Sequence, residues 1–228
     1  MTTMTLYSGP LSMYGAKVHI AALEKSLAIK VVLVPFTDDH RYEPKHPEVL
    51  RINPKGQVPV LVHGEVEIFD STQIFEYLEY LQPRPPLWPA STGARARARL
   101  LELKSDEVFF PYVIRLMSLQ DRLGEPPARD AIAQLHHYYR EMDALLADRD
   151  YLAGEYTYAD IAFFMAQLFA ARLGAPMSAA TPRLIAWRTR LAMRPAVQQI
   201  VVQFVQTLTR LGLSIPVFMS DAVAGGTD

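Results

Sequence analysis

The stretch that decides the fold is Asn53–Ser71, NPKGQVPVLVHGEVEIFDS. It reads as a short loop, an apolar strand over 58–62, a turn at His63-Gly64, a second strand, and an acidic-hydroxyl pair that opens a helix. Pro59 stands near the start of the first strand, where a residue without an amide proton belongs. A cis peptide bond at Val58–Pro59 fits here, because the tertiary amide reduces the trans preference to under about 1 kcal/mol.

This bend predicts a loop that binds a peptide. It would turn the main-chain N–H and C=O of Val58 outward, where they can pair with an extended peptide as an added strand does. Asp70-Ser71 then precede the amphipathic helical pattern of Thr72–Leu78. A helix N-terminus carries unpaired N–H groups and a partial positive charge, so it can hold a carboxylate. Together these features predict a clamp for a peptide backbone with an anion site one strand away.

Composition is that of an ordinary globular protein and excludes several classes of function. Of the 228 residues, 50% are hydrophobic and 21% are charged, and the formal net charge is −1. That balance lacks the basic face that nucleic-acid binding requires, so we expect no nucleic-acid partner. The sequence contains no cysteine. A disulfide framework, a thiolate metal site and cysteine-based redox chemistry are therefore excluded.

Neither end of the sequence predicts secretion or membrane insertion. The first ten residues, MTTMTLYSGP, lack the basic start and the apolar run of a signal peptide. The apolar segment 196–213 is interrupted by Gln199, Gln206 and Arg210, among others. It therefore reads as an amphipathic helix and not as a membrane span. We expect a cytoplasmic protein without a membrane partner.

Residues 1–82 predict an α/β domain of the thioredoxin-like type. Its elements before the opening stretch are Thr5–Tyr7 as a strand, Tyr14–Leu27 as a helix and Val31–Val34 as a buried strand. Such a β-α-β crossover favours parallel pairing of the two strands. A proline-rich connection over 35–51 is expected to be irregular. With the hairpin and a helix over Ser71–Leu81, the order is β-α-β-loop-β-β-α, which predicts a mixed sheet with helices on both faces.

Residues 83–92 predict a linker, because proline is frequent there. Residues 93–228 predict an all-α domain of about five helices. The first is expected over Gly93–Leu123, with a bend near Pro111, since an interior proline removes a backbone hydrogen bond. Thr157-Tyr158-Ala159-Asp160 has the spacing of a capping box before another helix. The other three helices are expected at Ala128–Ala147, Thr181–Met193 and Pro195–Leu211.

The motif NPxGxVPxL, followed by Asp-Ser at a helix start, resembles the glutathione-binding domain of the glutathione S-transferases. Residues 152–163, LAGEYTYADIAF, and 187–198, WRTRLAMRPAVQ, resemble the helical domain of that family. The resemblance runs over most of the chain. It implies a glutathione transferase of detoxification type, in which glutathione is the co-substrate and its thiolate attacks a hydrophobic electrophile. It also implies a homodimer, with the first domain of one subunit against the second domain of the other.

That reaction needs a group that lowers the thiol pKa of glutathione. A free thiol has a pKa near about 8.5, and a decrease of roughly two units requires about 2.7 kcal/mol of preference for the thiolate. Ser12 precedes the first helix, so it combines a hydroxyl donor with a helix N-terminus. The resemblance places the activating serine six residues before the valine of a K/R-V-x-I-A pattern, and Lys17–Ala21 puts Ser12 there. The alternative is that Ser12 only caps the helix.

Three other hydroxyls are rivals for this role. Some classes of the family use a tyrosine, which makes Tyr7 and Tyr14 alternatives. Tyr7 lies inside the first predicted strand and is expected to pack in the core. Tyr14 is a candidate for lining the pocket. Ser8, in the turn after that strand, is a weaker rival.

The resemblance also implies which residues of Asn53–Ser71 bind each part of the tripeptide. The main chain of Val58 would pair with the cysteinyl unit. Asp70 and Ser71 would hold the amine and the carboxylate of the γ-glutamyl unit. The alternative for Asp70 and Ser71 is a plain helix cap.

The glycyl end of the tripeptide is expected near the bend. Gln57 and Lys55 flank it and could reach the glycyl carboxylate, although an exposed lysine is usually only solvated. Many relatives carry a histidine in the preceding loop where this chain has Pro44. Lys45 or His40 is the candidate to replace it.

A pocket for the second substrate is expected where the first long helix meets the glutathione site. Phe109, Tyr112 and Arg115 are the candidate linings, with Phe204 or Leu208 from the last helix. The alternative is that aromatic residues at helical spacing pack in the core. No metal is expected, because His136 and His137 are adjacent on a helix and do not face one another.

Two further functions stay open at this stage. The same thiolate would serve a glutathione-dependent isomerase, dehalogenase or peroxidase. A non-catalytic scaffold protein that keeps the fold is the alternative from a different class. Nothing in the sequence names the physiological electrophile.

Overall fold

The computed structural model describes residues 3–37 and 39–219 of the chain. It divides into two compact units, neither of them continuous in sequence. The first comprises Met1–Pro86 and Gln198–Leu213, and the second comprises Leu87–Val197 and Ser214–Asp228. Part of the last helix therefore belongs with the α/β half of the chain. As boundaries of folding domains, the divisions at 82, 83–92 and 93 stay a prediction.

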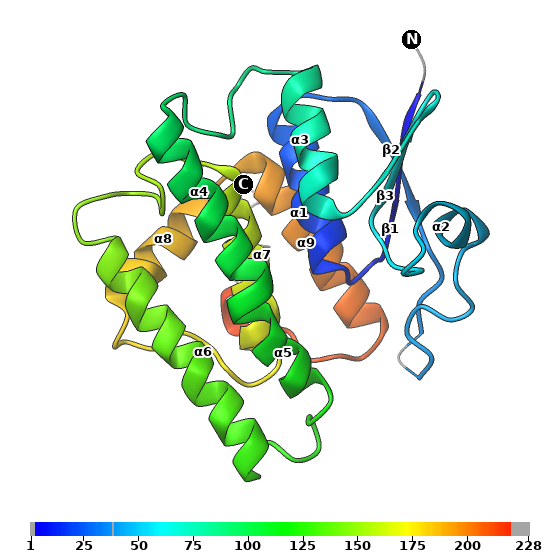
Figure 1. The fold of residues 1–228 in the computed structure, drawn as a ribbon. Coiled ribbons are helices and arrows are strands. Elements are labelled where there is room, and N and C mark those ends of the chain that lie inside the picture. The colour runs from blue at the N-terminus through cyan, green and yellow to red at the C-terminus, as the bar shows by residue number, and fades with distance from the viewer. Residues whose placement is uncertain (1–2, 38, 220–228) are drawn as a thin grey trace, which may run out of the picture. The chain divides into compact units, whose positions relative to one another are not determined.

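The first unit is built on a four-stranded sheet of order β2-β1-β3-β4 (Figure 1). The strands are β1 (Met4–Ser8), β2 (Ile29–Leu33), β3 (Val60–His63) and β4 (Val66–Phe69). β1 pairs parallel with β2 and antiparallel with β3, and β3 pairs antiparallel with β4. The predicted mixed sheet of a thioredoxin-like domain is thus confirmed.

The register brings four strand ends to one end of this sheet. Ser8 lies opposite Leu33, and Tyr7 lies opposite Val60. Val60 in turn lies opposite Phe69. The C-terminal ends of β1, β2 and β4 and the N-terminal end of β3 are therefore neighbours. The segments that carry the predicted glutathione residues all leave the sheet there.

Helices cover both faces of the sheet (Figure 1). α1 (Met13–Glu24) and α3 (Ser71–Leu81) lie on one face, and α2 (Pro47–Ile52) lies on the other. The cluster under α1 and α3 consists of Met4, Leu6, Val18, Ala22, Leu61, Ile74 and Leu78. The cluster under α2 consists of Val34, Val49 and Val60, with Tyr7 and Tyr42 packed against it. Successive residues of a strand point to opposite faces, which is why Leu6 and Tyr7 belong to different clusters.

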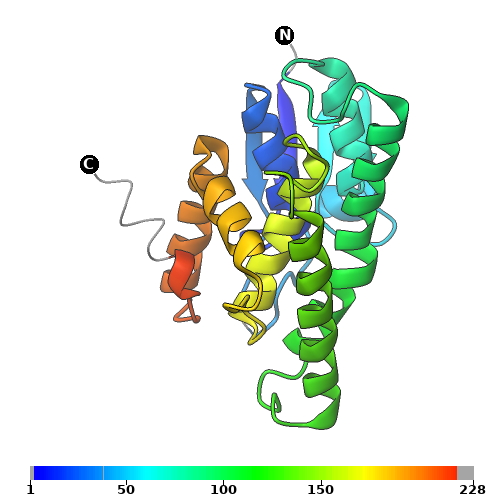
Figure 2. The same ribbon diagram turned by 90° about the vertical axis from the view of Figure 1, so that its left-hand side faces the viewer.

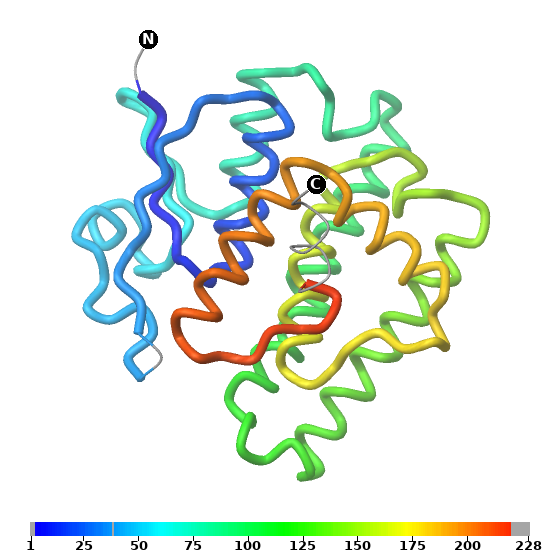
Figure 3. The backbone as a smooth tube through the Cα atoms, turned by 180° about the vertical axis from the view of Figure 1, so that it is seen from behind, coloured from blue at the N-terminus to red at the C-terminus, as the bar shows by residue number. Residues whose placement is uncertain are grey.

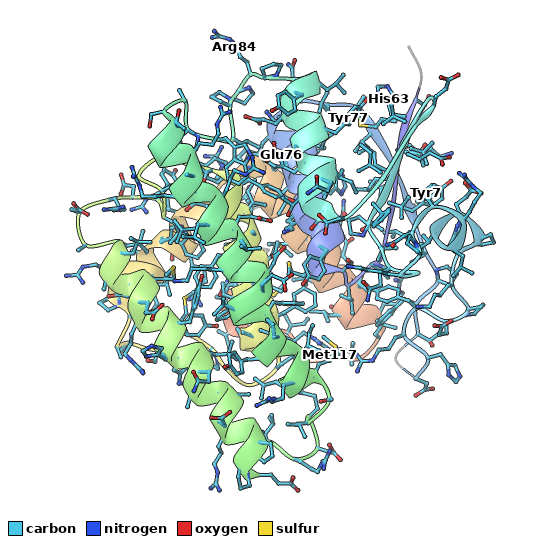
Figure 4. The ribbon with its side chains drawn as sticks, in the orientation of Figure 1. Tyr7, His63, Glu76, Tyr77, Arg84 and Met117 are labelled. Carbon is cyan, nitrogen blue, oxygen red and sulfur yellow. The ribbon has the colours of Figure 1, made fainter. Side chains whose placement is uncertain are left out.

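Side chains follow the same division. Figure 4 shows Tyr7 on the α2 side of the sheet, whereas His63 and Tyr77 meet between the β3–β4 hairpin and α3. His63 Nδ1 and the Tyr77 hydroxyl are 2.7 Å apart, at hydrogen-bond distance. The pair lies at the end of β3 away from Val60. It therefore fastens α3 to the hairpin at the end of the sheet opposite the predicted site.

α2 lies within the connection that was expected to be irregular, so that expectation was wrong for Pro47–Ile52. Proline at the first helical position has a suitable φ and needs no amide partner. His46 Nδ1 accepts a hydrogen bond from the Glu48 amide at 3.2 Å, which caps the helix. Val49 is its one fully buried residue among the described ones. A helix of this length has too few turns for a hydrophobic period to reveal it.

α9 (Pro195–Arg210) contributes its residues from Gln198 onward to the first unit. This part of the helix runs beside α1, as the tube from behind shows (Figure 3). A small hollow of about 40 Å³ lies between them. Its walls are Ser8–Pro10, Gly15, Ala16, His19, Val31 and Leu33 on one side, and Ile200, Gln203, Phe204 and Thr207 on the other.

The second unit is helical (Figure 2). Its elements are α4 (Thr92–Lys104), η1 (Ser105–Phe109), α5 (Phe110–Met117), α6 (Pro126–Leu145), α7 (Tyr158–Arg172) and α8 (Pro182–Ala192). α7 is the central helix, since its first thirteen residues, Tyr158–Ala170, are all buried. The all-α prediction for this half is confirmed.

One long helix over Gly93–Leu123 was predicted, and the structure corrects it. A π-helical turn, η1, separates α4 from α5 immediately before Pro111. Proline has no amide to bond the carbonyl four residues back, so the widened turn precedes it. The helix also ends earlier, at Met117. Ser118 Oγ and Gln120 Nε2 donate to the carbonyls of Arg115 and Leu116, both at 2.8 Å, and so replace the next helical turn.

The predicted capping box at Thr157 is confirmed. The Asp160 carboxylate accepts hydrogen bonds from the Thr157 amide at 2.9 Å and the Thr157 hydroxyl at 3.1 Å. It also accepts from the Leu152 amide and from Trp187 Nε1, both at 2.9 Å. Asp160 is completely buried, so it joins the loop before α7 to α8 through the core. Across residues 3–37 and 39–219, no helix has the length and apolar character that crossing a membrane requires.

Candidate functional site

Ser12 lies at the start of α1, four residues after the end of β1. Its backbone is extended, and its Oγ accepts a hydrogen bond from the Gly15 amide at 3.0 Å. The predicted N-cap role is therefore present. Because Oγ acts as the acceptor in that bond, its own O–H can still donate, and in the described part of the chain it has no acceptor. Ser12 is buried at the N-terminus of a helix, where negative charge is stabilised.

Ser8 lies directly beside this first turn. It is buried, and its hydroxyl makes only a long contact of 3.5 Å to the Gly9 carbonyl. A Cβ at Gly15 would come within 1.9 Å of Ser8 Oγ, so glycine is required for α1 to approach β1 this closely. The two hydroxyls of Ser8 and Ser12 thus converge on Gly15. Ser8 faces the hollow toward α9, together with Phe204.

The rings of the two rival tyrosines contact other side chains. The Tyr7 ring packs under α2, with its centroid 4.9 Å from that of His46. This agrees with the expectation that Tyr7 belongs to the core. The Tyr14 ring lies 5.5 Å from Nζ of Lys17, one turn further along α1, and that amine is completely buried.

The loop before β3 has the predicted bend. The Val58–Pro59 peptide bond is cis. Asn53 shapes the loop, since its Nδ2 donates to the Gln57 carbonyl at 2.6 Å and its Oδ1 accepts from the Lys55 amide at 3.0 Å. Among residues 3–37 and 39–219, no group pairs with the main-chain N–H or C=O of Val58. These two groups are the ones expected to bind an extended peptide.

Lys45 lies against the same loop. Its Nζ donates to the Gly56 carbonyl at 3.1 Å and is 3.4 Å from the Glu43 carboxylate. Gly56 has a φ of +59°, a value that favours glycine. The structure thus brings the Lys45 ammonium next to Gln57, which is exposed. His40, the other candidate, has its amide bonded to Thr37 Oγ1 at 3.1 Å in its own turn.

Asp70 is the N-cap of α3 and has a φ of 74°. Its Oδ1 accepts from the amides of Thr72 at 3.0 Å and Gln73 at 3.2 Å. The capping alternative is therefore realised, and two amides of the helix start are occupied by the protein itself. Ser71 is buried at the first position of the helix. A ligand amine would meet the exposed Asp70 carboxylate, whose other oxygen is not used in these two bonds.

Phe109, Tyr112 and Arg115 belong to η1 and α5 of the second unit. Phe109 is 1% exposed, and its ring lies 5.1–5.4 Å from those of Tyr138, Tyr139 and Phe163. Its side chain therefore packs in the core of this unit, which is the alternative reading for aromatic residues on this helix. Arg115 lies 5.8 Å from the Tyr112 ring and 3.3 Å from the Asp130 carboxylate. A second-substrate pocket on Tyr112 and Arg115 stays a prediction.

Tyr42 is a residue near the site that sequence reasoning missed. Its ring occupies the space that a side chain at Gly9 would need, since a Cβ there would lie 2.3 Å from Tyr42 Cε1. Its hydroxyl is buried and makes no hydrogen bond of normal geometry in the part of the chain that the structure describes. Burial raises the pKa of Tyr42, and the Leu11 main chain lowers it only in part. Tyr42 thus supports the Ser8–Ser12 turn from the α2 side, through a contact between distant segments that no local pattern reveals.

Comparison with known proteins gives the family. Residues 6–86 match the glutathione S-transferase N-terminal domain, and residues 105–195 match the glutathione S-transferase C-terminal domain. Glutathione S-transferase 3 of Zea mays is 33% identical over 213 residues, which cover 88% of this chain and 94% of that protein. The chain belongs to the glutathione S-transferase family.

Two other relatives widen this picture. A stringent starvation protein A homologue of Coxiella burnetii is 37% identical over 109 residues, and the match covers 47% of this chain and 48% of that protein. The chain thus matches about half the length of that relative. The crystal structure of a glutathione S-transferase from Rhodospirillum rubrum F11 has a TM-score of 0.80 at 27% identity, over 96% of this chain and 99% of that one.

Proposed function

We propose that this protein is a glutathione transferase in which Ser12 stabilises the thiolate of bound glutathione. The observation that carries the proposal is the state of the Ser12 hydroxyl. It accepts from the Gly15 amide at 3.0 Å at the start of α1, which leaves its proton for an acceptor outside the helix. A thiolate sulfur is such an acceptor. The partial positive charge of the helix N-terminus favours the same anion.

The reaction has two steps. The thiol of glutathione loses its proton to solvent, and Ser12 O–H donates to the resulting thiolate. The thiolate then attacks an electrophilic carbon of the second substrate, so that a carbon–sulfur bond forms and the leaving group departs with its electron pair. The contribution of Ser12 is electrostatic, since it neither forms a covalent bond nor takes the proton.

The remaining groups position the tripeptide. Val58 pairs its main chain with the cysteinyl unit, because its N–H and C=O have no partner among residues 3–37 and 39–219. Asp70 binds the γ-glutamyl amine and Ser71 binds the γ-glutamyl carboxylate at the start of α3. Lys45 reaches the glycyl carboxylate, since its ammonium already lies at the carbonyl of Gly56. Gln57 and Lys55, both exposed, are the other candidates there.

The test combines binding with catalysis. Titration calorimetry with glutathione is expected to give saturable binding, and a conjugation assay with a haloaromatic electrophile is expected to give turnover. Ser12→Ala is expected to reduce the rate by about tenfold at pH values below the bound-thiol pKa of the wild type, because there a rise of one pKa unit lowers the thiolate fraction about tenfold. Ser91→Ala is the matched control, since Ser91 caps α4 in the same way through the Ala94 amide. An equal rate in the Ser12 and Ser91 variants would refute the role of Ser12.

A second candidate function is favoured by one of the relatives. The match to the stringent starvation protein A homologue covers about half of each chain, and that relative is not named as a transferase, so a non-catalytic protein that keeps the fold is the second candidate. Calorimetry separates the two, because a docking protein need not bind glutathione. A glutathione-dependent isomerase, dehalogenase or peroxidase would bind it and use the same thiolate. Those activities are separated by assaying each substrate class with the wild-type protein.

We also propose that the protein is a cytoplasmic homodimer. Each unit exposes large apolar side chains: Tyr80 and Leu81 on α3 in the first, and Leu100, Leu103 and Ile114 in the second. Association of two copies would remove such surface from water. Sedimentation equilibrium is expected to give twice the mass of 25.7 kDa. A monomer at micromolar concentration would contradict this.

A further inference from the structure

A hollow in the second unit contains three arginines that the glutathione site does not use. It has a volume of about 330 Å³. One wall is the segment after α6, Leu146–Asp150, and the other is the face of α8 that carries Arg183, Ala186 and Arg190. α6 and α8 lie against one another within this unit (Figure 1). We propose that this hollow binds a small phosphorylated anion.

The spacing along α8 creates the hollow. Residues three and four apart lie on the same face of a helix, so Arg183, Ala186 and Arg190 form one stripe. Ala186 stands between the two long side chains and is exposed, which leaves the middle of the stripe open. Arg149 faces the stripe from the opposite wall. Three arginines therefore line one space, and the short side chain of Ala186 leaves its middle open.

The ion pairs of these arginines differ in strength. Arg190 holds the wall in place, since it donates to the Asp150 carbonyl at 2.7 Å and lies 2.8 Å from the Asp150 carboxylate. Arg149 makes a single contact of 3.3 Å with its neighbour Asp148. Exposed ion pairs of this kind contribute about 0–1 kcal/mol, so a ligand can replace them.

Arg183 is also available. Its contact with the Asp143 carboxylate is 3.5 Å long, and its side chain is 54% exposed. Asp143 Oδ1 is already bonded to the Leu184 amide at 2.9 Å, so this carboxylate serves mainly as the cap of α8. A guanidinium has five donors, and one long contact leaves most of them for a ligand. Arg149 and Arg183 are thus the two groups expected to bind.

The lining charges select the class of ligand. Two carboxylates, Asp148 and Asp150, share the hollow with the three guanidinium groups. A ligand with a single negative charge would stabilise the guanidinium groups little more than these aspartates already do. A phosphate or diphosphate carries more charge and several acceptor oxygens that match the planar guanidinium fork. The chemistry therefore favours a phosphorylated anion over a monocarboxylate.

The test is calorimetric titration of the full chain with inorganic pyrophosphate, in the absence of glutathione. Saturable binding is expected in the wild type. The double variant Arg149→Gln with Arg183→Gln is expected to weaken it at least about tenfold, through the loss of charge-assisted hydrogen bonds. The matched control is Arg188→Gln on the same helix, because that guanidinium lies 4.2 Å from the Phe218 ring and outside the hollow. It is expected to bind as the wild type does.

A second pair of variants tests the site independently, in case the double arginine variant does not fold. Ala186→Glu places a carboxylate in the middle of the hollow, and Ala186→Gln adds the same bulk without charge; the exposed position tolerates both. The glutamate is expected to abolish binding, and the glutamine is expected to weaken it less. The site is refuted if the wild type shows no saturable binding, if Arg188→Gln weakens binding as much as the double variant does, or if Ala186→Glu binds normally. Equal affinity for citrate refutes the assignment to phosphate. None of these outcomes depends on the glutathione proposal.

Discussion

Replacing Asp160 by asparagine tests how the helical unit is held together. The Asp160 carboxylate accepts four hydrogen bonds: from the amides of Leu152 and Thr157, the Thr157 hydroxyl and Trp187 Nε1. All four donors meet an acceptor only because both carboxylate oxygens are available. Burial raises the pKa of Asp160, and each of these bonds opposes that increase.

The magnitude follows from the change in hydrogen-bonding groups. Asparagine has one acceptor oxygen, which can keep the bonds to Leu152 and Trp187. Its NH₂ group would then face the Thr157 amide, donor against donor, whereas the Thr157 hydroxyl can rotate to accept. One buried amide loses its partner and bonds to a charged group are lost, which together cost about 3 kcal/mol. Cavity formation adds nothing, because the two side chains have nearly the same volume.

Urea denaturation followed by circular dichroism measures this loss. The control is Asp150→Asn, where the side chain is 72% exposed and the expected change is within about 0.5 kcal/mol. Equal slopes of the unfolding free energy against urea would show that both variants unfold from the same compact state. If Asp160→Asn lowered the free energy of unfolding by less than about 1 kcal/mol, the reasoning from its four donors would be wrong.

Three further perturbations test the first unit. Lys25→Met removes a completely buried amine that donates to the carbonyls of Gln82 and Pro85 and pairs with a glutamate of α3, so a loss of about 3 kcal/mol is expected in urea denaturation. Burial lowers the pKa of His19 from its ordinary 6.5. Its contribution to the free energy of unfolding is therefore complete above pH 6.5 and is lost as pH falls through the folded-state pKa. His19→Gln should flatten this part of the curve of unfolding free energy against pH, and an unchanged curve would contradict the reasoning. Gly9→Ala should cost about 2 kcal/mol through overlap with the Tyr42 ring, and Tyr42→Leu should remove most of that cost in a double-mutant cycle.

The sequence predicted those elements that are determined by residues close to one another along the chain. The helix α3 has the predicted bounds, Ser71–Leu81, because its apolar stripe lies within the segment and its Asp70 cap lies immediately before it. The capping box at Thr157 was equally readable, since its two partners are three residues apart. α2 was missed because six residues carry too little periodicity, and η1 because a widened turn has no composition of its own.

The site was predictable in part for the same reason. Ser12 as a helix cap and the bend at Val58–Pro59 follow from neighbouring residues, and both are present. Contacts between distant segments carried no such signal. The Tyr42 ring against Gly9 and the Lys45 ammonium on the Gly56 carbonyl depend on how the long connection folds back over the sheet.

The most direct measurement of the central claim is the pKa of the glutathione thiol when bound, obtained from thiolate ultraviolet absorbance as a function of pH. For the wild type, a pKa roughly two units below the free value of about 8.5 is expected. In Ser12→Ala the pKa should rise by at least about one unit, and Ser12→Thr should restore much of the difference because it keeps a hydroxyl. An identical bound-thiol pKa in the wild type and in Ser12→Ala would contradict the account.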